Sequence, residues 1–199
     1  MVNNRGMPRD PNRRQTILTA AERLFLRYGY DAVTVDSLCE ETGSSKGSFY
    51  HFFSSKEDLA IEMVGDVWRQ TQSRMAETFA PAVPPLERIR EELVHTTRPG
   101  PGKQLTGCPI GALAASLGRH ARVRRRLSFA FNHMRQYYVD AFREAIVSGD
   151  LDDHVDAEAM ADLMLLTVQG IGVLSRATHS APRIRRMVKN VLPQLTGRY

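Results

Sequence analysis

The sequence predicts an all-α protein, in which a three-helix DNA-binding domain precedes a larger helical domain. Apolar residues recur at helical spacing through most of the 199 residues, and no stretch shows the alternating pattern of a half-buried strand. Breaks rich in glycine and proline divide this pattern into about nine helices. Residues 34–53 also read as two short helices joined by a tight turn, a helix-turn-helix.

The first helix follows a short basic segment. Residues 1–10 are polar, and we expect them to form a disordered arm. Its arginines can either solubilise the chain or follow the backbone or minor groove of DNA. The helix itself is predicted from about residue 11 to Tyr28, with an apolar face that includes Phe25, and Gly29 ends it.

The helix-turn-helix is predicted from its caps and its unusual second helix. Thr34 can cap the first helix through its hydroxyl, and Gly43 can end it in the left-handed conformation. Ser44 or Ser45 caps the second helix, which continues to His51 and opens with small, polar and basic residues, none of them acidic. These properties favour a helix that enters a DNA groove over one that only fills a core.

A long helix of about residues 56–80 is expected to link the two domains. Ser55 can cap it, with Asp58 placed as in a capping box, and a proline-rich segment ends it. We therefore assign residues 11–58 to the DNA-binding domain and residues 59–199 to a ligand-binding and dimerisation domain.

The last two predicted helices indicate a homodimer. The segment 155–176 is apolar almost all round, so it must be covered on more than one side, and the final helix has a clean apolar stripe. The two could complete an intermolecular four-helix bundle, or they could simply finish the core of one chain. We favour the dimer, with these residues at its interface: Leu163, Leu166, Ile171, Leu174, Ile184, Met187, Val188, Val191, Leu192 and Leu195.

Composition restricts the class of protein. The net charge is +5, which permits an anionic partner. Two cysteines make neither a disulfide framework nor a zinc site, and the chain lacks both a signal-peptide core and an apolar run long enough for a membrane span. Catalytic motifs, paired metal ligands and phosphate-binding glycine loops are also missing. We expect a cytoplasmic protein that is not an enzyme and needs neither a metal nor a cofactor.

About 60 N-terminal residues resemble the TetR family of bacterial transcriptional regulators. The matching stretches are residues 20–25, residues 29–34 and, above all, residues 45–59 with the sequence SKGSFYHFFSSKEDL. The resemblance implies an all-helical homodimer. Its two DNA-binding domains, here called reading heads (residues 11–58 of each copy), occupy successive major grooves of a near-palindromic operator. It also implies that a small-molecule inducer in the larger domain moves the heads apart and releases the DNA.

The resemblance further implies the residues that contact DNA. By position these are Thr34, Ser44, Ser45, Lys46, Gly47, Ser48, Tyr50, His51 and Lys56. The two lysines suit phosphate, the caps Thr34 and Ser45 can also bind phosphate, and Gly47 allows close approach. Many relatives carry a bulky apolar residue at the position of Ser44, so both packing and phosphate binding stay open for it.

The inducer pocket is expected among the C-terminal helices, where apolar walls carry isolated polar groups. Its candidate residues, each of which could instead be plain core, are Trp68, Phe79, Phe131, His133, Met134, Tyr137, Met164 and Gln169. Cys108 is a further candidate, because it begins a helix whose dipole favours a reactive thiolate. It could sense electrophiles or oxidants, or it could be a small buried thiol. A DNA-binding regulator without any small ligand is the remaining alternative.

Overall fold

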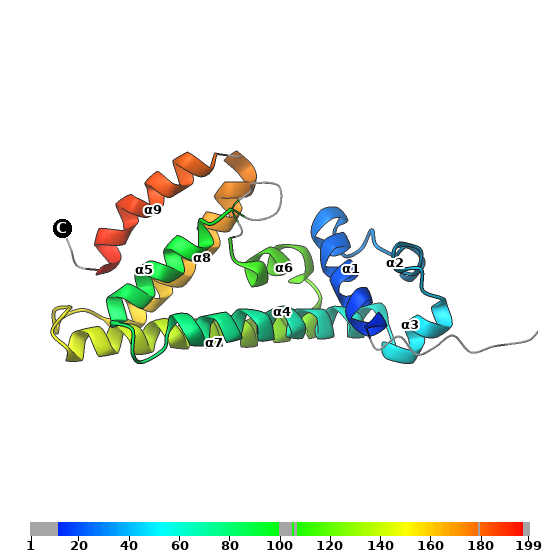
Figure 1. Ribbon diagram of the computed structural model, residues 1–199, viewed down its shortest axis with the longest axis horizontal. Coiled ribbons are helices and arrows are strands. Elements are labelled where there is room, and N and C mark those ends of the chain that lie inside the picture. The colour runs from blue at the N-terminus through cyan, green and yellow to red at the C-terminus, as the bar shows by residue number, and fades with distance from the viewer. Residues whose placement is uncertain (1–11, 100–104, 106, 179, 197–199) are drawn as a thin grey trace, which may run out of the picture. The chain divides into compact units, whose positions relative to one another are not determined.

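The computed structural model describes residues 12–99, 105, 107–178 and 180–196. These residues form nine α-helices and no strand, with one isolated β-bridge between Pro99 and Leu105 (Figure 1). The all-α prediction is therefore confirmed. The basic arm predicted for residues 1–10 lies outside the described residues.

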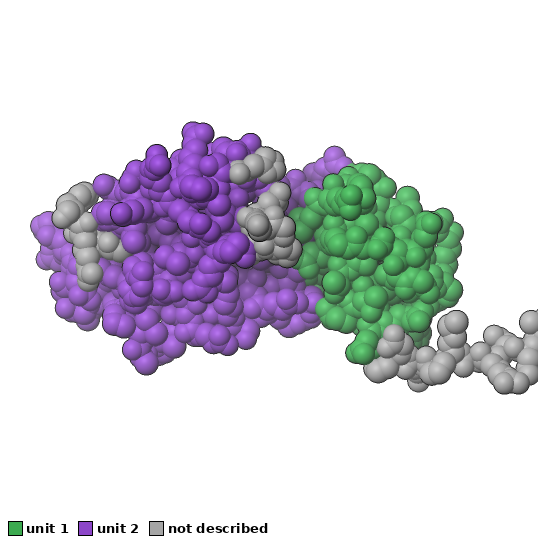
Figure 2. Space-filling model, turned by 45° about the horizontal axis from the view of Figure 1, so that its top comes forward, with its two compact units in different colours: residues 1–63 green, residues 64–199 purple. Residues whose placement is uncertain are grey.

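The chain divides into two compact units, residues 1–63 and residues 64–199 (Figure 2). The division falls inside the helix α4, Lys56–Thr78, which begins in the first unit and continues in the second. Each unit has its own hydrophobic core, which is the property expected of a separate domain.

The first unit is a small three-helix fold completed by the opening turns of α4. Its helices are α1 Arg13–Tyr28, α2 Val35–Thr42 and α3 Lys46–Phe52, and α2 packs against both of the others. The largest side chains of its core are fully buried: Ile17, Leu18, Phe25, Leu38, Phe49 and Phe53. Tyr28, the last residue of α1, is exposed, with the guanidinium of Arg27 lying over its ring.

The second unit is built around α7, Ala121–Val147, which packs against α5, α6 and α8. The other helices are α5 Pro85–Thr96, α6 Pro109–Leu117, α8 Ala157–Thr178 and α9 Ala181–Thr196. Both α5 and α6 begin with proline, whose missing amide hydrogen is tolerated in the first turn of a helix.

Helix α8 has two apolar sides, as the sequence indicated. Met164 and Val168 are buried in the core, whereas Leu163, Leu166 and Val173 lie on the opposite side and are exposed. This helix is long and apolar enough to cross a membrane, a test that core helices of soluble proteins also meet. The exposed stripe calls for a covering partner, because a monomer rarely leaves a continuous apolar surface open to water.

Part of the predicted dimer interface belongs to the core of a single chain. Ile171, Ile184, Val188 and Leu195 are buried without any partner chain, because α8 and α9 pack against each other and α5 covers both. These four residues are therefore not available to a second copy. The remaining predicted residues expose surface to different degrees, with Leu163, Leu166, Leu174 and Met187 the most exposed and Val191 and Leu192 half-buried.

Candidate nucleic-acid interface and ligand cavities

The turn between α2 and α3 is fixed by capping interactions at both ends of α2. The Thr34 hydroxyl accepts a hydrogen bond from the Ser37 amide at 3.1 Å, and the Ser37 hydroxyl accepts one from the Thr34 amide at 3.0 Å. Gly43 ends α2 with φ of 61°, and the following amide, of Ser44, donates to the Cys39 carbonyl at 2.9 Å. The predicted caps are confirmed, and Ser37 completes a reciprocal box that the sequence analysis missed because glutamate is the usual residue there.

Helix α3 is anchored on one side and open on the other. The Ser45 hydroxyl caps it by accepting a hydrogen bond from the Ser48 amide at 3.1 Å. Phe49 holds the helix to the core, as its ring is fully buried. On the open side Tyr50 exposes 54% of its surface, and Lys46, Gly47 and His51 are exposed beside it. The geometry therefore presents a polar and basic face on a rigid support.

Lys46 is paired with an acidic residue of the neighbouring helix, a contact that helical periodicity does not predict. Its ammonium lies 2.8 Å from a carboxylate oxygen of Asp36, near the start of α2, and both side chains are well exposed. This hydrogen bond raises the pKa of Lys46, so the side chain stays cationic. An exposed pair of this kind contributes little stability and can exchange its carboxylate for a phosphate.

Lys56 has a different environment from Lys46. Its ammonium donates to the backbone carbonyls of Tyr30 at 3.0 Å and Val33 at 2.8 Å, and it lies 4.2 Å from the centre of the Tyr30 ring. Burial lowers the pKa of Lys56. These contacts tie the start of α4 to the loop between α1 and α2, which is a structural role. The phosphate contact expected for Lys56 from the resemblance is untested, and the ammonium already has two backbone acceptors.

Ser44 and Gly47 occupy contrasting positions in the helix-turn-helix. Ser44 is buried, and its hydroxyl has no hydrogen-bond partner among the residues the structure describes. This placement favours the packing role over phosphate binding. Gly47 lies in the open: a methyl group built there would meet only the Ser45 hydroxyl, at an ordinary contact distance of 3.8 Å. The fold itself therefore does not require glycine at this position.

Three of the predicted ligand residues line one cavity of the second unit. Cys108, Phe131 and Gln169 share a space of about 180 Å³ between α6, α7 and α8. A second, smaller cavity of about 110 Å³ is also lined by Cys108, together with Met134 and the ion pair of Arg74 and the buried Glu92. The structure thus brings four of the candidate residues to two neighbouring cavities, and their assignment to an inducer site stays a prediction.

The surroundings of Cys108 favour the small buried thiol over the reactive thiolate. The residue does precede the first turn of α6, as expected. Burial nevertheless raises the pKa of the Cys108 thiol, and the neighbouring Gly111 and Ile110 amides and the Gln169 side chain offset this only in part. A neutral, buried thiol lacks both the thiolate character and the access that reactive cysteines share.

The other ligand candidates are core or surface residues of the second unit. Trp68, Phe79 and Met164 are buried, and Tyr137 lies against Phe79 with 5.5 Å between ring centres. His133 is exposed on α7, and its ring lies edge-on to Trp68. These side chains give the unit its packing, and their assignment to a ligand site stays a prediction.

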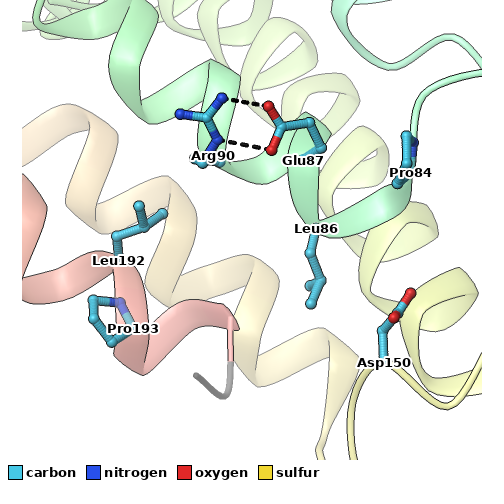
Figure 3. Close-up of a pocket in the computed structure, with 7 residues that line it drawn as sticks. All are labelled: Pro84, Leu86, Glu87, Arg90, Asp150, Leu192 and Pro193. Atoms are coloured by element: carbon cyan, nitrogen blue, oxygen red, sulfur yellow. Dashed lines mark hydrogen bonds and ion pairs between the residues drawn. The ribbon is translucent and has the colours of Figure 1, made fainter. Parts of the chain in front are cut away.

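A larger hollow of about 510 Å³ lies at the surface between α5 and α9 (Figure 3). Leu86 and Leu192 extend from these two helices, and Asp150 lies at its edge. Arg90, a basic residue that lines the hollow, is already paired with Glu87. None of the ligand candidates named from the sequence was placed here.

One group of potential metal ligands occurs in the described part of the chain. Asp152, Asp153 and His154 lie together in the loop between α7 and α8, and all three are exposed. Exposed acidic groups of this kind are common without a bound ion, so the cluster supports no metal site.

Comparisons with known proteins agree with the geometry of both units. Residues 17–63 match the family of bacterial regulatory proteins called the tetR family, and residues 85–191 match the tetracyclin repressor-like C-terminal domain. The HTH-type transcriptional regulator LmrA of Bacillus subtilis is 26% identical over 187 residues, which cover 93% of this chain and 97% of LmrA. The HTH-type regulator YdeS of the same species is 30% identical over 167 residues, covering 82% and 80% of the two chains.

A third relative and a solved structure extend the match. The transcriptional repressor AcnR of Corynebacterium diphtheriae is 40% identical over 86 residues, 43% of each chain. A TetR-family regulator from Agrobacterium tumefaciens shares the fold with a TM-score of 0.82 at 22% identity, covering 93% of this chain and 98% of its own. The chain thus belongs to the TetR family of bacterial transcriptional regulators, which are DNA-binding proteins and not enzymes.

Proposed function

We propose that this protein is a cytoplasmic, homodimeric repressor that binds a near-palindromic operator and releases it when a small molecule binds in the second unit. The observation that supports DNA binding most directly is the open face of α3, where Lys46, Tyr50 and His51 project from a helix that Phe49 and Ser45 hold in place. A rigid helix with such a face can enter the major groove. Two copies, set one helical turn of DNA apart, read a two-fold site.

The repressor role is supported by the relative AcnR, which is named as a repressor. Its match is confined to less than half of each chain, so we take only the mode of action from it. The roles within the reading head follow from chemistry. Lys46 and the caps Thr34 and Ser45 bind phosphate, whereas Tyr50 and His51 reach base edges or backbone.

Release by a small molecule is supported by the cavities of the second unit. Spaces of about 180 and 110 Å³ lie among α4, α5, α6, α7 and α8, and both carry polar groups in apolar walls. A solid core without cavities would instead favour the alternative, a DNA-binding regulator that has no small ligand. The alternative thiol sensor loses its physical basis, because burial raises the pKa of Cys108.

The test is a gel shift on the DNA that flanks the coding region of this protein, repeated at several salt concentrations. We expect a discrete complex on a near-palindromic segment, which weakens steeply as salt increases. A matched fragment with one half-site scrambled should bind far more weakly. No discrete complex on any flanking segment at low salt would overturn the proposal.

A further inference from the structure

The strongest unexplained feature of the second unit is the side chain of Gln169 on α8. Both polar atoms of its carboxamide are buried, and neither makes a hydrogen bond of normal geometry to any described residue. The carboxamide lies close enough to the Cys108 thiol to lower its pKa, but a thiol is only a weak donor and acceptor, so the carboxamide stays poorly satisfied. In that part of the chain the one other such atom is the Ser44 hydroxyl, which lies in the first unit. A buried polar group without a partner is unfavourable, and its presence in a native fold calls for an explanation such as a ligand.

The surrounding backbone holds Gln169 at the cavity. A methyl group built on Gly111 would lie 1.9 Å from the Gln169 carboxamide oxygen, so this oxygen sits directly over the glycine. Gly107 has φ of 58°, and a methyl group there would lie 2.8 Å from the Cα of Gly172. The loop before α6 therefore packs backbone to backbone against α8, and the two segments form a fixed wall around the carboxamide.

The volume of the cavity limits the size of its occupant. The space is about 180 Å³, and an apolar cavity of about 150 Å³ accepts a benzene molecule. One six-membered ring with a small polar substituent therefore fits. Phe131 in the wall can pack against such a ring.

The charge of the lining selects the substituent. Arg176, an exposed residue of α8, lines the cavity, and no acidic residue is among the residues described as lining it. The Cys108 thiol is neutral, because burial raises its pKa. A carboxylate would pair with the guanidinium, and a further hydroxyl or the second carboxylate oxygen would satisfy the carboxamide.

In the two other hollows described above for the second unit, the arginines already have partners. In the space of about 110 Å³, Glu92 binds Arg74 through two hydrogen bonds, at 2.6 and 3.0 Å. In the surface hollow of Figure 3, Arg90 is paired with Glu87. A ligand would have to break these pairs, whereas at Gln169 it would meet polar atoms that are poorly satisfied.

We propose that Gln169, Arg176 and Phe131 form the effector subsite, and that it takes a monocyclic aromatic carboxylate of the benzoate class. This inference rests on the proposed function, since it names the effector of the ligand-released repressor. Gln169 recognises the polar substituents, Arg176 pairs with the carboxylate, and Gly111 keeps the space above it open for the carboxamide.

The test is calorimetric titration of the full-length protein, without DNA, by benzoate, 4-hydroxybenzoate, benzamide and benzylamine. We expect saturable binding of the two carboxylates at one site per chain, weaker binding of benzamide and none of the cation benzylamine. Gln169→Leu should raise Kd at least tenfold, as it removes the hydrogen bonds while keeping the volume. Arg176→Gln should raise Kd for benzoate by a similar factor and leave that for benzamide unchanged.

The control is Gln136→Leu, which makes the same exchange on the exposed surface of α7, where the side chain donates a hydrogen bond to Asp140. It should bind like the parent protein. The melting temperature of Gln169→Leu should not fall, because the substitution removes a poorly satisfied buried group.

Three outcomes would overturn the subsite: no saturable binding of either carboxylate, equal binding of benzylamine, or unchanged affinity in both Gln169→Leu and Arg176→Gln. A failed gel shift would instead overturn the proposed function and leave the titration interpretable.

Discussion

At the scale of single residues, a substitution at Gly47 can distinguish what the fold requires from what DNA binding requires. Glycine inside a helix lowers stability by about 0.5–1 kcal/mol relative to alanine, and a methyl group at Gly47 would meet no obstacle within the first unit. A residue that the fold does not need, on the open face of α3, is expected to serve the approach of the duplex.

Gly47→Ala should therefore keep or raise the free energy of unfolding while weakening operator affinity at least tenfold, about 1.4 kcal/mol. Urea denaturation and a gel shift on the same protein sample measure the two effects. Gly43→Ala is the contrasting variant: its φ of 61° disfavours a side chain, so it should lose about 1–2 kcal/mol of stability. Unchanged operator affinity in a stable Gly47→Ala protein would contradict the close approach.

Substitutions of the two lysines of the reading head, Lys46 and Lys56, should have different effects on DNA binding and stability. Lys46→Ala should reduce the slope of log affinity against log salt by about one for each reading head, because one phosphate contact is lost. It should leave stability almost unchanged, since the pair with Asp36 is exposed. Equal salt slopes for Lys46→Ala and the parent protein would remove Lys46 from the interface.

Lys56→Met should show the opposite behaviour. Its ammonium holds the carbonyls of Tyr30 and Val33, so losing it should lower the free energy of unfolding by about 1.5–3 kcal/mol. The salt slope of the folded variant should stay that of the parent protein. A reduced slope with unchanged stability would restore Lys56 as a phosphate contact.

At the scale of helices, the second unit depends on a buried ion pair between α4 and α5. Glu92 is 1% exposed in its side chain and Arg74 is 27% exposed, and the two are joined by two hydrogen bonds. Removing one partner leaves the other charge poorly solvated, which is more damaging than replacing both.

Glu92→Leu should therefore destabilise the protein by about 2–4 kcal/mol, and the double variant Arg74→Met with Glu92→Leu should recover most of that loss. Urea denaturation of the two single variants and the double variant gives the coupling energy. Glu87→Leu is the surface control, because its pair with Arg90 is exposed and contributes at most about 1 kcal/mol. Additive losses in the double variant would contradict the coupling.

The helices themselves could be predicted far better than the site within them. Apolar spacing and end signals such as Gly43 and Pro85 act locally, so they indicated the elements of both units. Burial depends on how segments far apart in the sequence pack together, and local patterns do not predict it. Cys108 has the position expected of a thiolate, but it is enclosed. The partner of Lys46 is Asp36, ten positions earlier in the sequence, and helical periodicity does not pair residues on different helices.

At the scale of the whole molecule, the exposed stripe of α8 is the feature that calls for a second copy. Leu163, Leu166, Val173 and Leu174 expose between 39% and 70% of their surfaces along one side of the helix. A methyl group built on Gly170, in the middle of this stripe, would meet nothing within 4 Å, so another helix can approach closely there. In a two-fold dimer the same stripe would cover itself.

Leu166→Glu should convert the dimer into a monomer, because it places two carboxylates in the apolar contact and leaves them without partners. We expect the dimer dissociation constant to rise at least a hundredfold, about 2.7 kcal/mol, as measured by light scattering over a concentration series. The monomer should stay folded, since Leu166 is 70% exposed in one chain, and its operator affinity should fall as the two reading heads become independent. Val147→Glu is the control, a still more exposed apolar residue at the end of α7 and not on the α8 stripe, and it should leave the dimer intact. A Leu166→Glu protein that stays dimeric would show that a different surface joins the two copies.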